Sequence, residues 1–587
     1  MLGIALLGAT SCDDFLTIYP QDRVVEENFW EDKNDLEGVR YGAYQQMAST
    51  VHKLIVWGDV RSDAYYLNQD YHSQDDYYTY KKIMLAELDS TMGFYDWGSV
   101  YTTINFCNKV LANGELVLSR DAQFTRTEWN QMKAEVTALR ALNYFYLLRS
   151  FKDIPYSKEV INSDEETHPF TATPQMEVLD SLIDDVKAVA GQAHNRFGGS
   201  NGTADTKGLM TNTAIYALLC DMYLWRSALL EGRGVSADSV KADAQAAIDA
   251  GMKSIEYLAL QTEQTVNSQF DRLRVEKDDF GSGISNAQLI QNKDAQGDFN
   301  GMGSVTVDSY LRIFAYGNSD ESIFELQFNT SDQRKNTAVN TMFGHTDATI
   351  LCASADAMEN ALNNNKTNIA QDTRLWYSCT KRTAATGDKE ELSHPYMLKW
   401  NDCSFTSDGS KVRTRHSESE YRNWIVYRLT DVMLMIAEAK AVVGAYRECR
   451  DIVDAVHKRS LLDQETGLSN NENTAQKCID LVMKERLLEL CGEGKRWFDL
   501  VRYAERIGGG RNADPFQPQY MDGADGVKKM VENWLGKGAY NRQQAVLENR
   551  IKNRYGLYSP VYYMELRANQ YLFPQNPVWN REKGIPE

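Results

Sequence analysis

The chain has 587 residues, of which 43% are hydrophobic and 25% are charged, a composition typical of a globular protein with a large core. It carries 63 Lys and Arg residues against 82 Asp and Glu residues, a formal net charge of −19 at pH 7. Nucleic acids and anionic membrane surfaces attract cations, so this acidic balance argues against both as partners.

The first eleven residues predict a lipoprotein signal peptide. Residues 1–10 carry no charge and are mostly apolar, but they are too few to span a bilayer, which needs about 20 apolar residues. Cys12 follows Ala9, Thr10 and Ser11 and resembles a bacterial lipobox, in which the chain is cut before the cysteine. We therefore expect residues 1–11 to be removed and Cys12 to carry the lipid.

Helical spacing of apolar residues dominates the first half of the chain. Residues 131–151 predict a helix that is apolar on two faces and therefore buried among other helices. Residues 211–230 predict another helix, followed by a partner over 242–250 with Gly251 as its C-cap. A similar pair is predicted within 428–458. Recurrent helix pairs with Ala and Tyr at packing positions are typical of degenerate tetratricopeptide repeats.

Residues 252–427 differ from these helical blocks because they are rich in Asn, Asp, Gly, Ser and Thr. This composition predicts long loops with short strands, such as one over 323–328. Loops laid over a rigid scaffold are the usual place for binding residues.

Motifs of catalysis and metal binding are weak in this sequence. No two cysteines form a C-x-x-C pair and no two histidines lie four residues apart, so zinc ribbons and helical zinc sites have no support. The string from Gly198 to Gly202 matches G-x-S-x-G, but it lies in a polar stretch with no strand before it, and we interpret it as a flexible loop.

Charged residues are densest among apolar residues between Lys484 and Arg502, where carboxylates recur at every fourth position. A glycosidase requires a pair of carboxylates. Here arginines alternate with the carboxylates and favour their ionised form, which is unsuitable for a general acid. We therefore predict a structural ion-pair network, formed by Glu485, Arg486, Glu489, Glu493, Lys495, Arg496, Asp499 and Arg502.

Several short strings occur together in a characteristic order and spacing: Cys12–Leu16, Phe29–Trp30, Tyr41–Tyr44, Ala134–Glu135, Leu139–Phe145, Ile323–Glu325, Asp372–Arg374, Ala437–Ala439, Glu485–Leu490, Gly494–Arg502 and Tyr571–Pro577. Through these strings the chain, from Cys12 to its end, resembles the SusD/RagB family of outer-membrane nutrient-binding lipoproteins.

The resemblance implies a mainly α fold, with about four tetratricopeptide-like helix pairs as a scaffold and a loop-rich, short-stranded ligand-binding half. Residues 12–587 would form one domain. Its helical scaffold would cover about 30–251 and 428–506, its loop-rich insert about 252–427, and a loop-rich C-terminal segment 507–587.

The resemblance also implies a function. Members of the family sit at the cell surface as a lid on a SusC-like TonB-dependent transporter, capture an oligosaccharide or in some members a peptide, and pass it to the barrel. Members of the family are not enzymes. The resemblance therefore implies no catalytic residues, no cofactor and no metal for this chain. The family's matching strings are mostly scaffold, so they carry over no ligand residues.

Alternative functions stay open at this point. Nothing in the sequence separates a glycan-binding member of this family from a peptide-binding one. A secreted glycosidase would need two unpaired carboxylates in a cleft. A pure tetratricopeptide scaffold that binds a protein chain would need no exposed aromatic residues in its loops.

The ligand face is predicted from the chemistry of sugars, which offer an apolar C–H face and a rim of hydroxyls to exposed aromatic rings flanked by polar side chains. Residues 57–80 have this composition and show no sustained helical period, which predicts a loop. Trp57 and one tyrosine of each Tyr-Tyr pair are expected to point inward. Loops at 280–316, which include Tyr316, are candidates to close over this face, and the region of Trp376 and Trp400 is the alternative site. The candidate ligand residues are Trp57, Arg61, Asp63, Tyr65, Tyr66, Tyr77, Tyr78 and Tyr310.

Overall fold

The structure of the chain is a computed structural model. It describes residues 29–579 except 69–72, 163–169, 196–206, 264–312, 315–316, 329–333, 345–348, 355–356, 359–360, 362–371, 373, 375–396, 401, 406–411, 416–420, 461–472, 510–521, 538–542 and 573–574. Some predicted features lie outside the described residues: Cys12, the string from Gly198 to Gly202, Tyr310, Tyr316 and Trp376.

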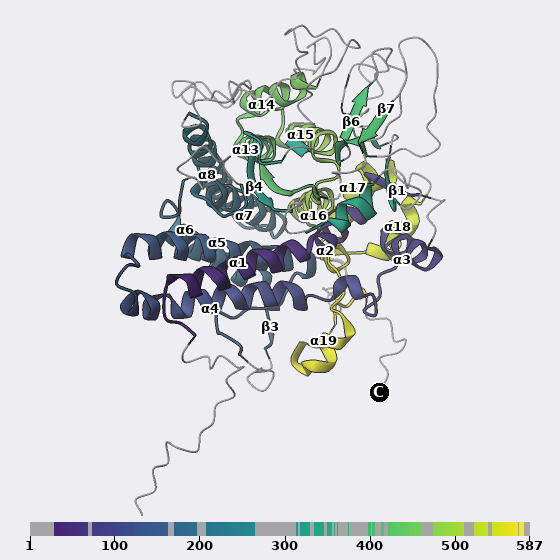
Figure 1. The fold of residues 1–587 in the computed structure, drawn as a ribbon. Coiled ribbons are helices and arrows are strands. Elements are labelled where there is room, and N and C mark those ends of the chain that lie inside the picture. Colours follow the sequence, from purple (N-terminus) through teal and green to yellow (C-terminus); the bar gives the residue numbers. More distant parts are fainter. Residues whose placement is uncertain are drawn as a thin grey trace, which may run out of the picture.

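Four long helices form a layer near the N-terminal end: α1 (Lys33–Ser49), α4 (Gly98–Arg120), α5 (Arg126–Phe151) and α6 (Gln175–Val189). Helix α4 packs on α1 and α5, and α5 packs on α6 (Figure 1). A capping box of Thr125 and Glu128 starts α5, which explains why the helix begins before the predicted residue 131. Residues 134–151 of α5 are all buried, so the prediction of a helix with two apolar faces is confirmed.

Six further helices complete the helical body: α7 (Asn212–Gly232), α8 (Ala237–Glu263), α13 (Leu429–Val443), α14 (Tyr446–Arg459), α15 (Ala475–Leu490) and α16 (Arg496–Ile507). Helix α7 packs on α8 and α16, and α13 packs on α8, α14 and α15. The helix pairs predicted after residue 211 and within 428–458 are therefore present.

One boundary prediction is wrong, because α8 does not end at Gly251 but continues to Glu263. A Cβ atom at Gly251 would lie 2.6 Å from Ile436 Cδ1 of the neighbouring helix α13. This glycine therefore permits close contact between α8 and α13, and it is not a C-cap.

The strands among the described residues are short, and they pair antiparallel in twos. The pairs are β1 (Tyr65–Leu67) with β5 (Leu351–Ala353), β2 (Ile154–Pro155) with β3 (Ala172–Thr173), β4 (Ser322–Leu326) with β8 (Trp424–Arg428), and β6 (Asp402–Phe405) with β7 (Val412–Arg415). Every residue of β4 and β8 is buried. Since β8 runs directly into α13, this pair joins the predicted insert to the helical body.

The short elements are α2 (Val51–Ile55), the π-helical turn η3 (Val56–Val60), α3 (Gln74–Met84), η4 (Gly93–Tyr95), α9 (Thr337–Phe343), η9 (Leu398–Trp400), α17 (Ala524–Asn533), η12 (Leu535–Lys537), α18 (Gln544–Ile551), η13 (Arg554–Leu557), α19 (Tyr563–Ala568) and η14 (Gln570–Leu572). The segment after residue 507, which was predicted to be loop-rich, contains three short α-helices, α17, α18 and α19. These helices have at most ten residues each, too few for a clear helical period in the sequence.

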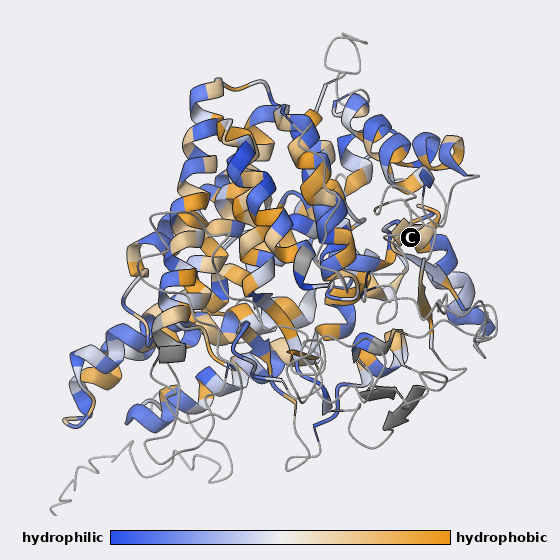
Figure 2. Cartoon of the chain, turned by 90° about the horizontal axis from the view of Figure 1, so that it is seen from above, coloured by the Kyte–Doolittle hydropathy of each residue, from blue (hydrophilic) through white to orange (hydrophobic). Residues whose placement is uncertain are grey.

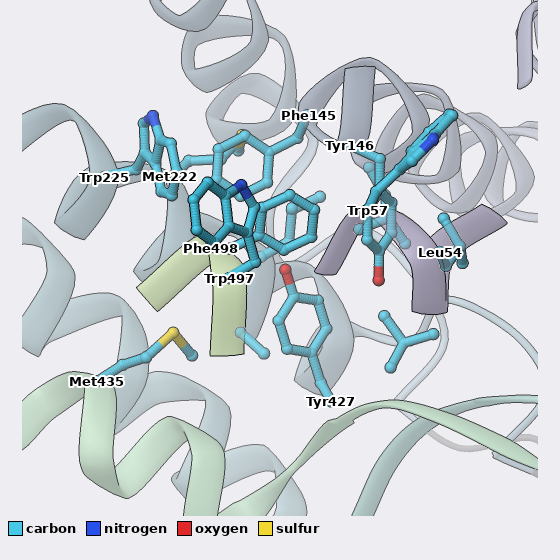
Figure 3. Packing of buried hydrophobic residues seen from close by; sticks show 14 of the residues in the cluster. Leu54, Trp57, Phe145, Tyr146, Met222, Trp225, Tyr427, Met435, Trp497 and Phe498 are labelled. Atoms are coloured by element: carbon cyan, nitrogen blue, oxygen red, sulfur yellow. The ribbon is translucent and has the colours of Figure 1, made fainter. Parts of the chain in front are cut away.

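The core lies where α5, α7 and α16 meet. Phe145 and Tyr146 of α5, Trp225 of α7, and Trp497 and Phe498 of α16 gather there (Figure 3), and all five are at most 6% exposed. Hydrophobic residues concentrate on the helices in the middle of the molecule, and hydrophilic residues lie towards the outer helix ends (Figure 2). This core holds the elements that position the candidate site.

Gly58 of η3 is a point of close backbone contact that we expect to be sensitive to substitution. A Cβ atom at Gly58 would lie 1.9 Å from the carbonyl oxygen of Gly494, so the backbones must separate in Gly58→Ala. We expect its free energy of unfolding to fall by about 1–3 kcal/mol. Gly38→Ala is the control, because open space surrounds the exposed Gly38 within α1. It should stabilise by about 0.5–1 kcal/mol. The denaturant midpoints of Gly58→Ala, Gly38→Ala and the parent test both expectations. A Gly58→Ala midpoint equal to that of the parent would contradict the close contact with Gly494.

Candidate functional site

The segment predicted as the ligand loop is ordered structure. It runs through η3 and β1 and, beyond residues 69–72, forms α3. Four candidate ligand residues within it are buried, with 0–4% exposure: Trp57, Arg61, Asp63 and Tyr65. The prediction that these side chains contact ligand is corrected, because each is used inside the protein. The alternative residue Trp400 is also buried, at 2% exposure, and stacks on Trp424 at 5.4 Å between ring centroids.

The two buried aromatic rings of the segment have internal partners. The Trp57 indole donates a hydrogen bond to the Phe94 carbonyl at 2.8 Å, and its ring packs edge-on against Phe151. The Tyr65 hydroxyl donates to Asp59 at 3.1 Å and accepts from the Gly492 backbone N–H at 2.6 Å. Both side chains therefore fasten η3 and β1 to the body.

The acidic residues of the segment accept hydrogen bonds from residues at the start of α16 and in the turn before it. Asp59 accepts hydrogen bonds from the backbone N–H groups of Gly494 at 2.7 Å and Arg496 at 3.2 Å. Burial raises the pKa of Asp59 to about 6, although these hydrogen bonds act in the opposite direction. Asp63 receives the Arg496 guanidinium in a two-pronged contact, with distances of 2.7 and 2.8 Å.

Arg61 holds the C-terminal part of the chain. Its guanidinium donates to the carbonyls of Gly556 at 2.7 Å and Leu557 at 3.0 Å, and lies 4.0 Å from the centre of the Trp497 ring. Burial lowers the pKa of Arg61 to about 10. No sequence signal separates this role from ligand binding, because all three partners lie more than 400 residues away along the chain.

Two tyrosines of the segment are exposed, Tyr66 at 37% and Tyr78 at 56%. In β1 the burial alternates, so that Tyr65 and Leu67 face the core and Tyr66 faces outward. In α3, Tyr77 is half-buried and meets Tyr78 edge-on at 5.8 Å between ring centroids. The expectation that Trp57 and one tyrosine of each pair point inward is thus confirmed. We call the exposed Tyr66 and Tyr78, together with the half-buried Tyr77 beside Tyr78, the tyrosine surface.

The tyrosine surface has a rigid base. Helix α3 packs against β1 and η3, and its first turn is capped by the Ser73 side chain. Tyr66 lies opposite the buried Cys352 of β5 in the strand register. An outward ring held on packed elements loses little conformational freedom when a ligand binds, which favours recognition.

The predicted cluster of charges lies inside the protein and is ion-paired, but its three glutamates pair with cations from outside residues 484–502. The carboxylates of Glu485, Glu489 and Glu493 are at most 3% exposed and pair with Arg374, Arg428, Arg459 and Lys399. Burial alone would raise their pKa values, but the surrounding cations hold all three below the ordinary value. These carboxylates stay ionised and buried, so the prediction that the network is structural is confirmed.

Two negative findings concern the described part of the chain. No helix there is long and apolar enough to cross a membrane. Within the same residues, no group of three or more His, Cys, Asp or Glu side chains is arranged to hold a metal ion.

Comparison with known proteins identifies the family. The family model described as the SusD family matches residues 262–579, more than half of the chain. A second model, described as starch-binding and associating with the outer membrane, matches residues 14–224. The chain therefore belongs to the SusD family, which confirms the resemblance seen in the sequence.

Individual relatives agree with this assignment. The chain is 24% identical over 510 residues to SusD-like protein P38 of Formosa agariphila, covering 85% of this chain and 89% of that protein. The fold is similar to a SusD homologue of Bacteroides thetaiotaomicron, with a TM-score of 0.61, 18% identity, and coverage of 94% and 100%. It is also similar to a laminarin-binding SusD-like protein, with a TM-score of 0.56, 17% identity, and coverage of 93% and 100%. The mainly helical fold with short strands is thus that of SusD-like proteins.

Proposed function

We propose that this chain is a cell-surface binding lipoprotein that captures an oligosaccharide or polysaccharide and delivers it to a SusC-like TonB-dependent transporter of the outer membrane. The observation that carries the proposal is the tyrosine surface, where two exposed rings stand on a rigid base in a member of the SusD family. A flat ring next to polar side chains suits the C–H face and hydroxyl rim of a sugar.

The energetics of such a surface suit capture and release. A ring and a sugar that hide about 100 Å² of apolar surface gain up to about 2.5 kcal/mol at 25 cal/mol per Å². Two rings with hydrogen bonds, less the cost of immobilising the ligand, give roughly millimolar to micromolar affinity. A site of this strength concentrates a glycan at the surface and still releases it to a transporter.

The double variant Tyr66→Ala/Tyr78→Ala tests the tyrosine surface. Affinity electrophoresis against a panel of polysaccharides should show retention of the parent by at least one of them. The double variant should bind that polysaccharide at least about tenfold more weakly, which corresponds to a loss of 1.4 kcal/mol.

Tyr41→Ala is the matched control, because Tyr41 of α1 is exposed at 46% but lies outside the tyrosine surface. It should bind like the parent. If the polysaccharide retains the double variant as strongly as the parent, the tyrosine surface is not the binding site. If the parent binds peptides but no polysaccharide, the chain is a peptide-binding member of the family.

The lipid anchor is tested at Cys12. We expect Cys12→Ala to release the protein into the soluble fraction, since only a cysteine thiol can carry the thioether lipid. Each buried methylene of an acyl chain contributes about 0.8 kcal/mol, so more than one chain gives lasting attachment. Cell fractionation with labelled palmitate measures the effect, and Ser11→Ala is the control for the local change. A Cys12→Ala protein that still pellets with membranes and takes up label would place the anchor elsewhere.

The transporter partnership is tested by tagging the chain in its native cell. Gentle detergent extraction should co-purify a TonB-dependent barrel protein with it. Recovery of the tagged chain without any such barrel protein would contradict the delivery role. This result would not bear on glycan binding, which the tyrosine variants test separately.

A further inference from the structure

A pocket of about 820 Å³ opens between the start of α4, the extended segment 155–161 and the residues of α19 and η14. This volume is within the range of roughly 300–1,000 Å³ for small-molecule sites. None of its lining residues belongs to the tyrosine surface. Figure 1 shows α19 at the lower edge of the molecule, whereas β1 and α3 lie at its right side. The pocket is thus separate from the tyrosine surface.

Aromatic rings form a continuous part of the pocket lining. Trp97 meets Tyr101 edge-on at 5.7 Å, and Tyr101 meets Tyr144 edge-on at 6.1 Å. Tyr571 of η14 also lines the pocket and is 52% exposed. Tyr571 therefore offers a ring to a ligand without any rearrangement of the core.

The segment 155–161 is held rigidly, so the pocket is preformed. The Asn105 amide donates to the Ile161 carbonyl at 2.7 Å and accepts from the Ile161 N–H at 2.9 Å. Further side chains bind the same main chain: Asn108 to the Glu159 carbonyl at 2.9 Å, Tyr101 to the Pro155 carbonyl at 2.7 Å, and Tyr144 to the Ser157 carbonyl at 2.6 Å. On the opposite side, Asn569 donates to the Phe170 carbonyl at 2.7 Å.

These contacts decide which class of ligand the pocket suits. The asparagine and tyrosine groups that recognise a polypeptide backbone are already bound to the main chain of this protein. They are not free to hold an incoming peptide strand. The charged side chains of the lining are the carboxylates of Glu159 and Glu565 and the guanidinium of Arg567. Carboxylates accept hydrogen bonds from hydroxyls and a guanidinium donates to them, while the aromatic rings cover an apolar face.

We infer that this pocket is a second carbohydrate-binding site, which takes a neutral di- or trisaccharide unit with Tyr571 as the stacking ring and Glu159 as a hydroxyl acceptor. The inference rests on the proposed function, since it assigns a further site for the same class of ligand. Two separate sites on one chain strengthen attachment to a long glycan, because binding at the first raises the effective concentration at the second.

The experiment uses saturation-transfer NMR on the full chain with four probes: maltose, cellobiose, laminaribiose and lactose. The starting protein is Tyr66→Ala/Tyr78→Ala, in which the tyrosine surface is removed. We expect at least one disaccharide to receive saturation from this protein. Adding Tyr571→Ala should abolish the transfer, and adding Glu159→Gln should reduce it at least threefold. Both substituted residues are exposed, so the melting temperature should stay unchanged.

Met564→Ala is the matched control, because Met564 of α19 is exposed at 49% but does not line the pocket. It should leave the transfer unchanged. Transfer that survives both Tyr571→Ala and Glu159→Gln would overturn the pocket assignment, as would the absence of transfer from all four probes. Transfer that the parent shows and Tyr66→Ala/Tyr78→Ala already lacks would also overturn the pocket, while supporting the tyrosine surface of the proposed function.

Discussion

Arg496→Ala is expected to lower the free energy of unfolding by about 3–5 kcal/mol, because it leaves the Asp63 carboxylate buried without its partner. Asp63 is 2% exposed and receives two hydrogen bonds from the Arg496 guanidinium. The same guanidinium also donates to the Met483 carbonyl at 2.9 Å. Denaturant unfolding measures the loss, and the affinity of the folded fraction for its glycan should stay at the parental value.

Two comparison variants separate this effect from the loss of any arginine. Arg126→Ala removes an ion pair with Glu115 in which both side chains are more than half exposed, and it should leave the unfolding midpoint unchanged. The double variant Asp63→Leu/Arg496→Met removes both charges and should recover much of the stability, since hydrophobic replacement of a buried pair is often neutral. A parental unfolding midpoint in Arg496→Ala, together with lost glycan binding, would assign Arg496 to the ligand site.

Acid is expected to unfold the protein through groups whose pKa is lowered in the folded state, and Glu438 of α13 is a well-defined case. Burial would raise its pKa, but Arg502 and Arg506 lower it to about 2. Arg502 contacts both carboxylate oxygens at 2.7 and 3.0 Å, and Arg506 contacts one at 3.2 Å. The stabilisation from this group is fully present above pH 4.5 and is lost as the pH falls towards 2. At about 1.4 kcal/mol per pKa unit, the loss approaches about 3 kcal/mol.

Melting temperatures of the parent and Glu438→Gln between pH 2 and 7 test this prediction. The variant should be less stable than the parent at pH 7, and the difference should shrink as the pH falls below 4.5. Asp59 acts in the opposite sense, since its pKa is raised to about 6 and its contribution is lost as the pH rises through that value. Because the parent and Glu438→Gln both contain Asp59, its contribution cancels in the difference between their melting temperatures. A difference in melting temperature between the parent and Glu438→Gln that stays constant down to pH 2 would contradict the role of Glu438.

The ion-pair network explains why distant parts of the chain form one body. Arg428 at the end of β8 bonds Glu489 of α15 and Glu493 of the following turn at 2.8 Å each. Arg374, from the predicted insert, pairs with Glu485 and Glu489. Each charge is compensated only when all of these elements are in place, so the network makes the attachment of the insert cooperative with the scaffold.

The helical layers could be predicted from the sequence because their cause is local. Apolar residues at helical spacing and a capping box are present within residues 125–151 whatever the rest of the chain does. Gly251 shows the limit of local reasoning. A glycine after an apolar helix is typical of a C-cap, yet here Ile436 of another helix requires the absence of a side chain.

By itself, the sequence determined the mainly helical fold and the SusD family, since these depend on local periodicity and on ordered strings. It also indicated that the charges around Glu489 are structural, but only the tertiary structure showed that the partners of Glu489 are Arg374, Arg428 and Arg459 from outside the alternating segment. Only the tertiary structure decided which rings and polar groups of residues 57–80 face solvent. Tyr65 and Tyr66 are chemically identical neighbours, but Tyr65 meets the backbone of Gly492 and Tyr66 does not. The pocket beside Tyr571 was equally beyond sequence reasoning, because its walls come from α4, α5 and the C-terminal residues, which only folding brings together.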